Sequence, residues 1–118
     1  MAKILVVDDA EFLRVRISKL LTSNGHEVIE ADNGVNAVST YRSGKPDAVL
    51  MDITMPEMDG LAALKEIRSG DPNARVVMLT ALGQESVVLE AIKAGAKDFV
   101  VKPFEPDRVL AAIGKVLG

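Results

Sequence analysis

Short apolar runs alternate with stretches of helical periodicity along the chain, and this alternation constrains the fold more than any other feature. The runs have the length of buried strands, and they are Ile4–Val7, Val28–Ile29, Ala48–Met51, Val76–Leu79 and Phe99–Val101. Between them, apolar residues recur at the spacing of one helix face, as Leu13, Ile17 and Leu20 do. The pattern predicts an α/β fold, with a doubly wound five-stranded parallel sheet and five helices.

Glycine, asparagine and proline mark the expected ends of the helices. Gly25 is placed to end the first helix in a left-handed conformation. Asn33-Gly34 is placed to open the second helix, which we expect to end near Gly44. Pro106 suits the first turn of the last helix.

Polar residues stand where four of the apolar runs end. Asp8-Asp9, Asp52, Thr80 and Lys102 each follow such a run directly. In open parallel sheets, ligands bind beyond the carboxyl ends of the strands, where the strand order changes direction. The sequence therefore predicts that three carboxylates, a hydroxyl and an ammonium share a small volume.

Each of these residues has an ordinary structural explanation when it is taken alone. Asp8-Asp9 suits a helix cap, Thr80 a strand position and Lys102 a solvated surface. Three converging carboxylates repel one another, however, and they persist most readily around a cation. Oxygen ligands favour Mg²⁺ or Mn²⁺. A hydroxyl and an ammonium at the same edge suit the oxygens of a phosphoryl group in transfer.

Composition excludes several other functions. A chain of 118 residues with a net charge of -3 and few aromatic residues is expected to be one domain with no affinity for nucleic acid. It contains no cysteine and one histidine, which excludes thiolate chemistry and disfavours a zinc site. The sequence holds neither a phosphate-binding loop of the nucleotide hydrolases nor an apolar stretch of membrane-span length. We expect a cytoplasmic protein that does not enter a membrane.

Four stretches together resemble the receiver domain of two-component response regulators. They are Ile4–Asp9, Met51–Gly60, Leu79–Ala81 and Val101–Phe104, each at a strand end. The resemblance extends over essentially the whole chain, and the opening Asp-Asp-Ala-Glu-Phe-Leu-Arg is most similar to the single-domain chemotaxis regulators. It implies the flavodoxin-like receiver fold with strand order 2-1-3-4-5. We expect one receiver domain over residues 1–118, without an output domain.

The resemblance also implies chemical roles. Asp52 becomes the phosphoacceptor, and Thr80 and Lys102 contact the phosphoryl group. Asp8, Asp9, Asp52 and the backbone carbonyl of Thr54 hold Mg²⁺, for which Mn²⁺ is a possible substitute. The protein is then a signalling switch that assists its own phosphorylation and dephosphorylation, and not an enzyme acting on a separate substrate.

Several further positions are assigned to switching and tuning. By resemblance, Thr80 and Phe99 form the switch, although Phe99 is equally explained as a core residue. Motor-binding chemotaxis regulators commonly have tyrosine there. Leu82 and Pro103 are candidates for residues that tune the site, and by resemblance Leu82 stands where family members adjust the lifetime of the phosphoryl group. The Lys102-Pro103 peptide bond can be cis or trans. On the fourth helix, Val87 or Val88 forms either part of a partner surface or a half-buried edge.

The expected partners follow from the same resemblance. They are a sensor histidine kinase or phosphotransfer domain, and an output protein that docks on the face of helix 4, strand 5 and helix 5. The flagellar motor switch is the candidate for this output protein. We expect a monomer.

A phosphorelay intermediate or cell-cycle regulator is the alternative within the class. A small Mg²⁺-dependent phosphatase is less favoured, because Thr54 stands where such enzymes place a second aspartate. An unphosphorylated interaction module is a third possibility.

Overall fold

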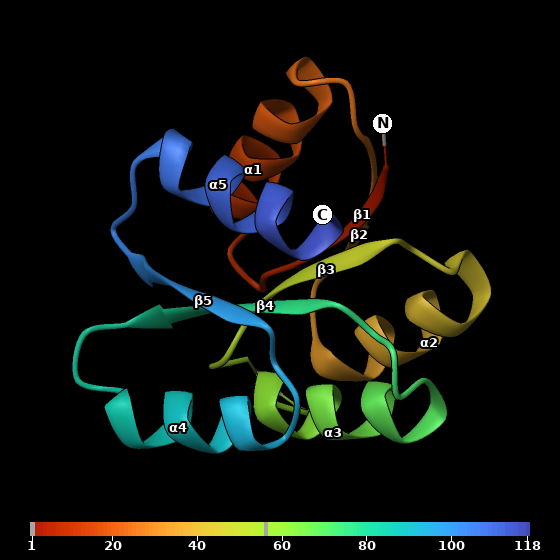
Figure 1. Cartoon of the computed structure of the whole chain (residues 1–118), viewed down its shortest axis with the longest axis vertical. Coiled ribbons are helices and arrows are strands. Elements are labelled where there is room, and N and C mark those ends of the chain that lie inside the picture. The colour runs from red at the N-terminus through yellow and green to blue at the C-terminus, as the bar shows by residue number, and fades with distance from the viewer. Residues whose placement is uncertain (1, 56) are drawn as a thin grey trace.

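The computed structural model describes residues 2–55 and 57–118, and it confirms the predicted alternation of strands and helices (Figure 1). In chain order the elements are β1 (Lys3–Val7), α1 (Glu11–Ser23), β2 (Glu27–Ala31), α2 (Gly34–Gly44), β3 (Ala48–Asp52), α3 (Gly60–Gly70), β4 (Val76–Ala81), α4 (Glu85–Lys93), β5 (Asp98–Lys102) and α5 (Pro106–Leu117). Pro56, inside the Met51–Gly60 stretch that carries the resemblance, lies outside the described residues.

All strand pairs are parallel, and the order across the sheet is β2-β1-β3-β4-β5, as predicted. The chain passes from β1 outwards to β2 and then returns past β1 to β3. The carboxyl ends of β1 and β3 are therefore neighbours at the point where the winding direction changes. This is the place where doubly wound sheets bind their ligands.

Helices cover both faces of the sheet, which explains why the central strands are continuously apolar. In Figure 1, α1 and α5 lie above the sheet, and α2, α3 and α4 lie below it. Alternate residues of one strand enter different cores: Leu5 packs on the side of α2, α3 and α4, and Ile4 packs on the side of α1 and α5. Burial of each such side chain contributes about 1.5–3 kcal/mol. This packing holds the strand ends in fixed positions.

The predicted helix ends are confirmed. Gly25 has φ of 89°, a left-handed conformation that a residue without a side chain adopts readily. Asn33 caps α2, because its side-chain oxygen accepts a hydrogen bond of 2.8 Å from the Asn36 amide. Pro106 is the first residue of α5. None of the helices within residues 2–55 and 57–118 has both the length and the hydropathy of a membrane span.

Candidate functional site

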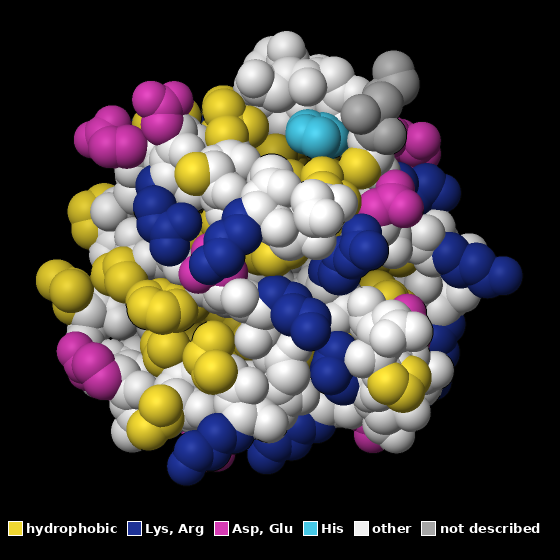
Figure 2. Space-filling model, viewed as in Figure 1, with side chains coloured by type: hydrophobic (Ala, Val, Ile, Leu, Met, Phe, Trp, Pro, Cys, Tyr) yellow, Lys and Arg dark blue, Asp and Glu magenta, His cyan; other side chains and the backbone are white. Residues whose placement is uncertain are grey.

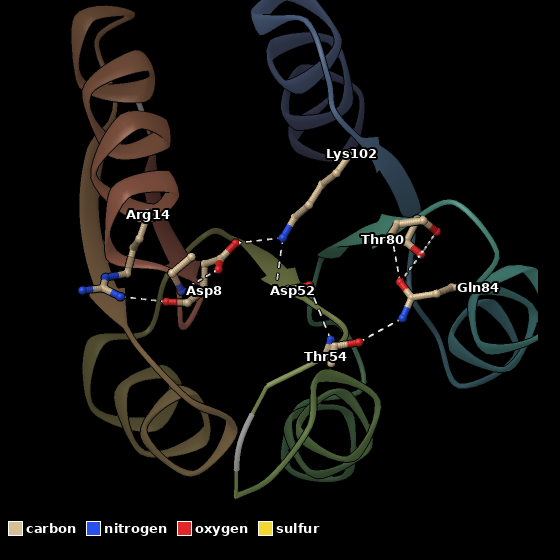
Figure 3. A network of polar contacts seen from close by, with 9 residues as sticks. Asp8, Arg14, Asp52, Thr54, Thr80, Gln84 and Lys102 are labelled. Atoms are coloured by element: carbon tan, nitrogen blue, oxygen red, sulfur yellow. Dashed lines mark hydrogen bonds and ion pairs between the residues drawn. The ribbon is translucent and has the colours of Figure 1, made fainter.

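The structure brings the predicted strand-end residues together at the carboxyl edge of the sheet (Figure 3). Asp8 and Asp9 follow β1, Asp52 ends β3, Thr80 is the penultimate residue of β4, and Lys102 ends β5. Parallel pairing aligns these ends, so residues up to 94 positions apart in the sequence are in contact. The predicted convergence is therefore present, whereas the chemical role of each residue stays a prediction.

Three carboxylates form a compact acidic cluster. Asp8, Asp9 and Asp52 each offer an oxygen, and these oxygens lie within 4.8 Å of one another. Asp8 is fully buried, Asp52 is 8% exposed and Asp9 faces solvent. The Lys102 Nζ atom lies 3.2 Å from an oxygen of Asp8 and 3.2 Å from an oxygen of Asp52. One ammonium offsets one of three negative charges, so the cluster remains anionic.

The cluster fits a small hard cation. Magnesium binds oxygen ligands at about 2.1 Å, so oxygens up to about 4.2 Å apart share one octahedral ion. The three carboxylate oxygens need only a small side-chain movement to reach that spacing. Their residue types exclude soft ligands, and Asp9 keeps one side of the cluster open to water. The Thr54 carbonyl stays a predicted fourth ligand.

Two contacts fix the turn that carries Asp8. The Ala10 amide donates a 2.9 Å hydrogen bond to the Asp8 carboxylate. Arg14 on α1 donates a 2.7 Å bond to the Asp8 carbonyl oxygen and a 2.9 Å bond to Glu30 on β2. The guanidinium thus ties the acidic turn to a neighbouring strand. The sequence shows Arg14 only as a basic residue in the first turns of a helix, so this contact was not predicted.

Burial raises the pKa of the Asp52 carboxyl above its ordinary value, because a charged carboxylate is poorly solvated there. The Lys102 ammonium opposes this increase, and the Asp8 carboxylate adds to it. A weak hydrogen bond of 3.4 Å from the Thr54 amide also favours the charged form. Without a cation, the ionised Asp52 is therefore a destabilising charge.

We predict that Asp52→Asn raises the free energy of unfolding of the metal-free chain at neutral pH. Because the folded pKa is raised, the native state binds the proton more tightly than the unfolded state. In the unchanged chain, the contribution of Asp52 to stability consequently falls as pH rises from about 4, the ordinary aspartate range, through the raised pKa. Denaturant unfolding with a chelator, repeated across this range, should show the advantage of the asparagine variant growing with pH. An advantage that is independent of pH would contradict the prediction.

A second polar network lies beside the acidic cluster, and its centre is Gln84. The buried Thr80 hydroxyl donates a 2.9 Å hydrogen bond to the Gln84 side-chain oxygen, and the Gln84 side-chain nitrogen donates a 2.9 Å bond to the Thr54 hydroxyl (Figure 3). Sequence reasoning did not anticipate Gln84. Its position before α4 indicated only the start of a helix.

Comparison with known proteins assigns the family. The response regulator receiver domain matches residues 4–114. The chain belongs to the response regulator receiver family. Among curated relatives, it is 59% identical to the chemotaxis protein CheY of Bacillus subtilis, with 98% of this chain and 97% of that protein covered. It is 55% identical to CheY of Thermotoga maritima, over 97% of this chain and 96% of that protein. A solved CheX–CheY–BeF3–Mg²⁺ complex from Borrelia burgdorferi contains a similar chain, with 39% identity, a TM-score of 0.93, and coverage of 98% and 89%.

This receiver domain has a groove of about 330 Å³ between α4 and β5, next to the strand-end residues. Thr80, Leu82, Val88 and Phe99 are among its lining residues. Phe99 is half-buried and packs against the core on the side of α4, so both explanations of this residue agree with its position. Leu82 is 81% exposed at the edge of the groove.

The remaining predicted positions of the receiver domain are also placed. The Lys102-Pro103 bond is cis. Val87 and Val88 are half-buried and pack against the core, and Val88 also lines the groove. The more exposed apolar side chains of α4 are Leu89 and Ile92. The helix therefore presents apolar surface to solvent, and a role for that surface in partner binding stays a prediction.

Proposed function

We propose that this receiver domain, as a single domain of residues 1–118, is a stand-alone response regulator of chemotaxis signalling in the cytoplasm. It accepts a phosphoryl group on Asp52 and then changes its affinity for a partner. The observation that carries this proposal is the position of Asp52, which lies in an acidic cluster and 3.2 Å from the Lys102 ammonium. The near-complete coverage of chemotaxis relatives supports it.

The proposed reaction uses a carboxylate as the nucleophile. An Asp52 oxygen attacks the phosphorus of a phosphohistidine on a sensor kinase or phosphotransfer domain; the P–N bond breaks, a P–O bond forms, and the histidine leaves. Lys102 and Thr80 stabilise the charge on the phosphoryl oxygens. Asp8, Asp9, Asp52 and the Thr54 carbonyl would hold Mg²⁺, or Mn²⁺ in its place, and the bound ion would supply positive charge that neutralises the carboxylates. Attack by water on the same phosphorus then breaks the P–O bond to Asp52, releases inorganic phosphate and restores the carboxylate. The chain is thus a switch and turns over no separate substrate.

The proposed output begins at Thr80. Its hydroxyl moves to bond a phosphoryl oxygen, and Phe99, which lines the same groove, turns inward behind it. These contacts differ between the two states, and they shift a two-state equilibrium by their difference in free energy. Phe99 lacks the hydroxyl of tyrosine, so a partner recognises only the position of its ring.

The surface formed by α4, β5 and α5 is the proposed docking face. Leu82, Leu89 and Ile92 are exposed apolar side chains on or next to α4. Figure 2 shows apolar side chains gathered between β5 and α4, with lysine and arginine side chains along the border of the cluster. Such a face suits an amphipathic segment of an output protein, and we propose the flagellar motor switch as that protein. We propose that the chain acts as a monomer.

Labelling tests the proposal. The chain is incubated with Mg²⁺ and acetyl phosphate, its intact mass is measured, and binding partners are recovered with and without the label. We expect the mass of one phosphoryl group, a requirement for Mg²⁺, and one partner retained only by the labelled chain. Steady turnover of a small phosphomonoester without accumulation of label would favour a phosphatase instead.

Leu82→Glu is predicted to shorten the lifetime of the phosphorylated chain severalfold. Leu82 is an apolar side chain two residues after Thr80, and we infer that it limits access of water to the phosphoryl group. A carboxylate there orients water instead. Decay of the label after removal of acetyl phosphate measures the lifetime. Val35→Glu, at an exposed apolar residue on α2 that does not line the groove, is the matched control. Equal decay of the Leu82→Glu variant and the unchanged chain would refute the role.

A further inference from the structure

Gln84 connects two loops across the carboxyl edge of the sheet. It precedes α4 and is half-buried. Its side-chain oxygen accepts hydrogen bonds from the Thr80 hydroxyl at 2.9 Å and from the Ala81 amide at 2.7 Å. Its side-chain nitrogen donates to the Thr54 hydroxyl at 2.9 Å. Because the Ala81 amide can only donate, it determines which end of the Gln84 amide is the oxygen.

The bond to Gln84 uses the single proton of the Thr80 hydroxyl. A hydroxyl has one hydrogen to donate. While that hydrogen points to Gln84, or to the Ala81 carbonyl at the longer distance of 3.3 Å, it does not stabilise a phosphoryl oxygen on Asp52. The two arrangements of Thr80 are therefore mutually exclusive.

The bond to Thr54 anchors Gln84 to the segment that follows the acceptor, Asp52. Thr54 is two residues after Asp52, and its amide donates to the Asp52 carboxylate. Gln84 is held by three hydrogen bonds, two from the end of β4 and one from the loop after β3, so it remains in position when no phosphoryl group is present. It is a preformed acceptor for the Thr80 hydroxyl.

We propose that Gln84 is a positioning residue that holds the Thr80 hydroxyl in the unphosphorylated arrangement, a contact we call the Gln84 latch. This inference rests on the proposed function. An anionic phosphoryl oxygen is a charge-assisted acceptor, roughly twice as strong as the neutral Gln84 oxygen. Phosphorylation therefore favours the open latch, whereas one neutral hydrogen bond keeps the latch closed in most molecules when no phosphoryl group is present.

Removal of the latch should favour the phosphorylated arrangement. We expect Gln84→Ala to bind beryllofluoride, a phosphoryl mimic, about two- to tenfold more tightly in the presence of Mg²⁺, the factor that one neutral hydrogen bond contributes. The full chain is titrated with beryllofluoride at fixed Mg²⁺, and thermal unfolding without the mimic is measured in parallel. Ser86→Ala is the matched control, since this exposed neighbour makes no side-chain hydrogen bond to another residue within 2–55 and 57–118. Its affinity should equal that of the unchanged chain.

A double-mutant cycle separates the latch from other effects of the substitution. Thr80→Val removes the hydroxyl that the latch holds. In this background, Gln84→Ala should leave the affinity for beryllofluoride unchanged. Tighter binding in both backgrounds would overturn the latch, because the effect would not pass through Thr80.

A second readout needs no substitution. Gln84 is the only glutamine of the chain, so its side-chain amide gives a single glutamine NH2 signal in an NMR spectrum. We expect this signal to shift when Mg²⁺ and beryllofluoride bind. A signal that does not shift would overturn the latch.

The outcomes distinguish the latch from the proposed function. If the unchanged chain does not bind beryllofluoride with Mg²⁺, the proposed function fails, and the latch fails with it. If the unchanged chain binds and Gln84→Ala binds equally or more weakly, the latch alone is overturned. A lower melting temperature of Gln84→Ala with unaltered affinity would assign Gln84 a merely structural role.

Discussion

Asp52→Asn is expected to reduce covalent labelling by acetyl phosphate by roughly a hundredfold or more, because removal of a nucleophile removes the reaction that it starts. Asparagine has nearly the same shape as aspartate, but its amide does not attack phosphorus. The variant also loses one of three negative charges in the cluster, so we expect weaker binding of Mg²⁺. Intact mass spectrometry after incubation with Mg²⁺ and acetyl phosphate measures the label.

Asp47→Asn provides a matched control for the loss of label. Asp47 precedes β3 and therefore lies at the opposite end of the strand that Asp52 ends. Its side chain accepts a 2.8 Å hydrogen bond from the Lys3 amide, which asparagine can also accept. We expect this variant to label like the unchanged chain. Full labelling of the Asp52→Asn chain would place the acceptor elsewhere and remove the basis of the proposed function.

Gly60→Ala is expected to lower the free energy of unfolding by about 1–3 kcal/mol, because the added methyl group has no space. Gly60 begins α3, and its amide donates a 2.6 Å hydrogen bond to the Ile53 carbonyl. A Cβ atom at this position would overlap the backbone carbonyl oxygen of Asp52 and lie 2.8 Å from the Ile53 Cα atom. Relief of this overlap requires movement of the backbone that carries Asp52. We therefore expect phosphorylation to slow as well.

Gly114→Ala is the control for the glycine substitution. Gly114 lies inside α5, and an added Cβ atom has no atom within 4 Å apart from the adjacent backbone of its own helix. Alanine in a helix is more stable than glycine by about 0.5–1 kcal/mol, so this variant should be more stable than the unchanged chain. Denaturant unfolding compares the two substitutions, and the labelling rate tests the site. A Gly60→Ala chain as stable as the unchanged one would show that α3 moves away at little energetic cost.

The architecture could be predicted because its determinants are local. A buried parallel strand needs an uninterrupted apolar run, as Val76–Leu79 shows, and the helices need apolar residues at their own period. Capping by Asn33 and the left-handed conformation of Gly25 depend on few neighbours, so the helix ends were also predictable. The strand order came from the family resemblance, since no local pattern contains it.

The site could be predicted only in part. Asp8, Asp52 and Lys102 stand at strand ends, so the parallel sheet itself brings them together. Gln84 and Arg14 were missed because each acts through side-chain bonds to another loop or strand, over 30 residues for Gln84–Thr54 and 16 for Arg14–Glu30. Such contacts depend on how the packed helices position the loops, so they cannot be inferred from the spacing of residues in the sequence.

The amino-acid sequence by itself determined the α/β alternation, the residues that end each strand, and the oxygen-rich character of the site. These properties follow from periodicity and residue type, which act over a few positions. Only the tertiary structure decided that the Lys102 ammonium contacts both Asp8 and Asp52, that Gly60 has no space for a side chain, and that Gln84 holds the Thr80 hydroxyl. Distances of a few ångströms decide such contacts, and they are set by the packing of the whole domain around the sheet.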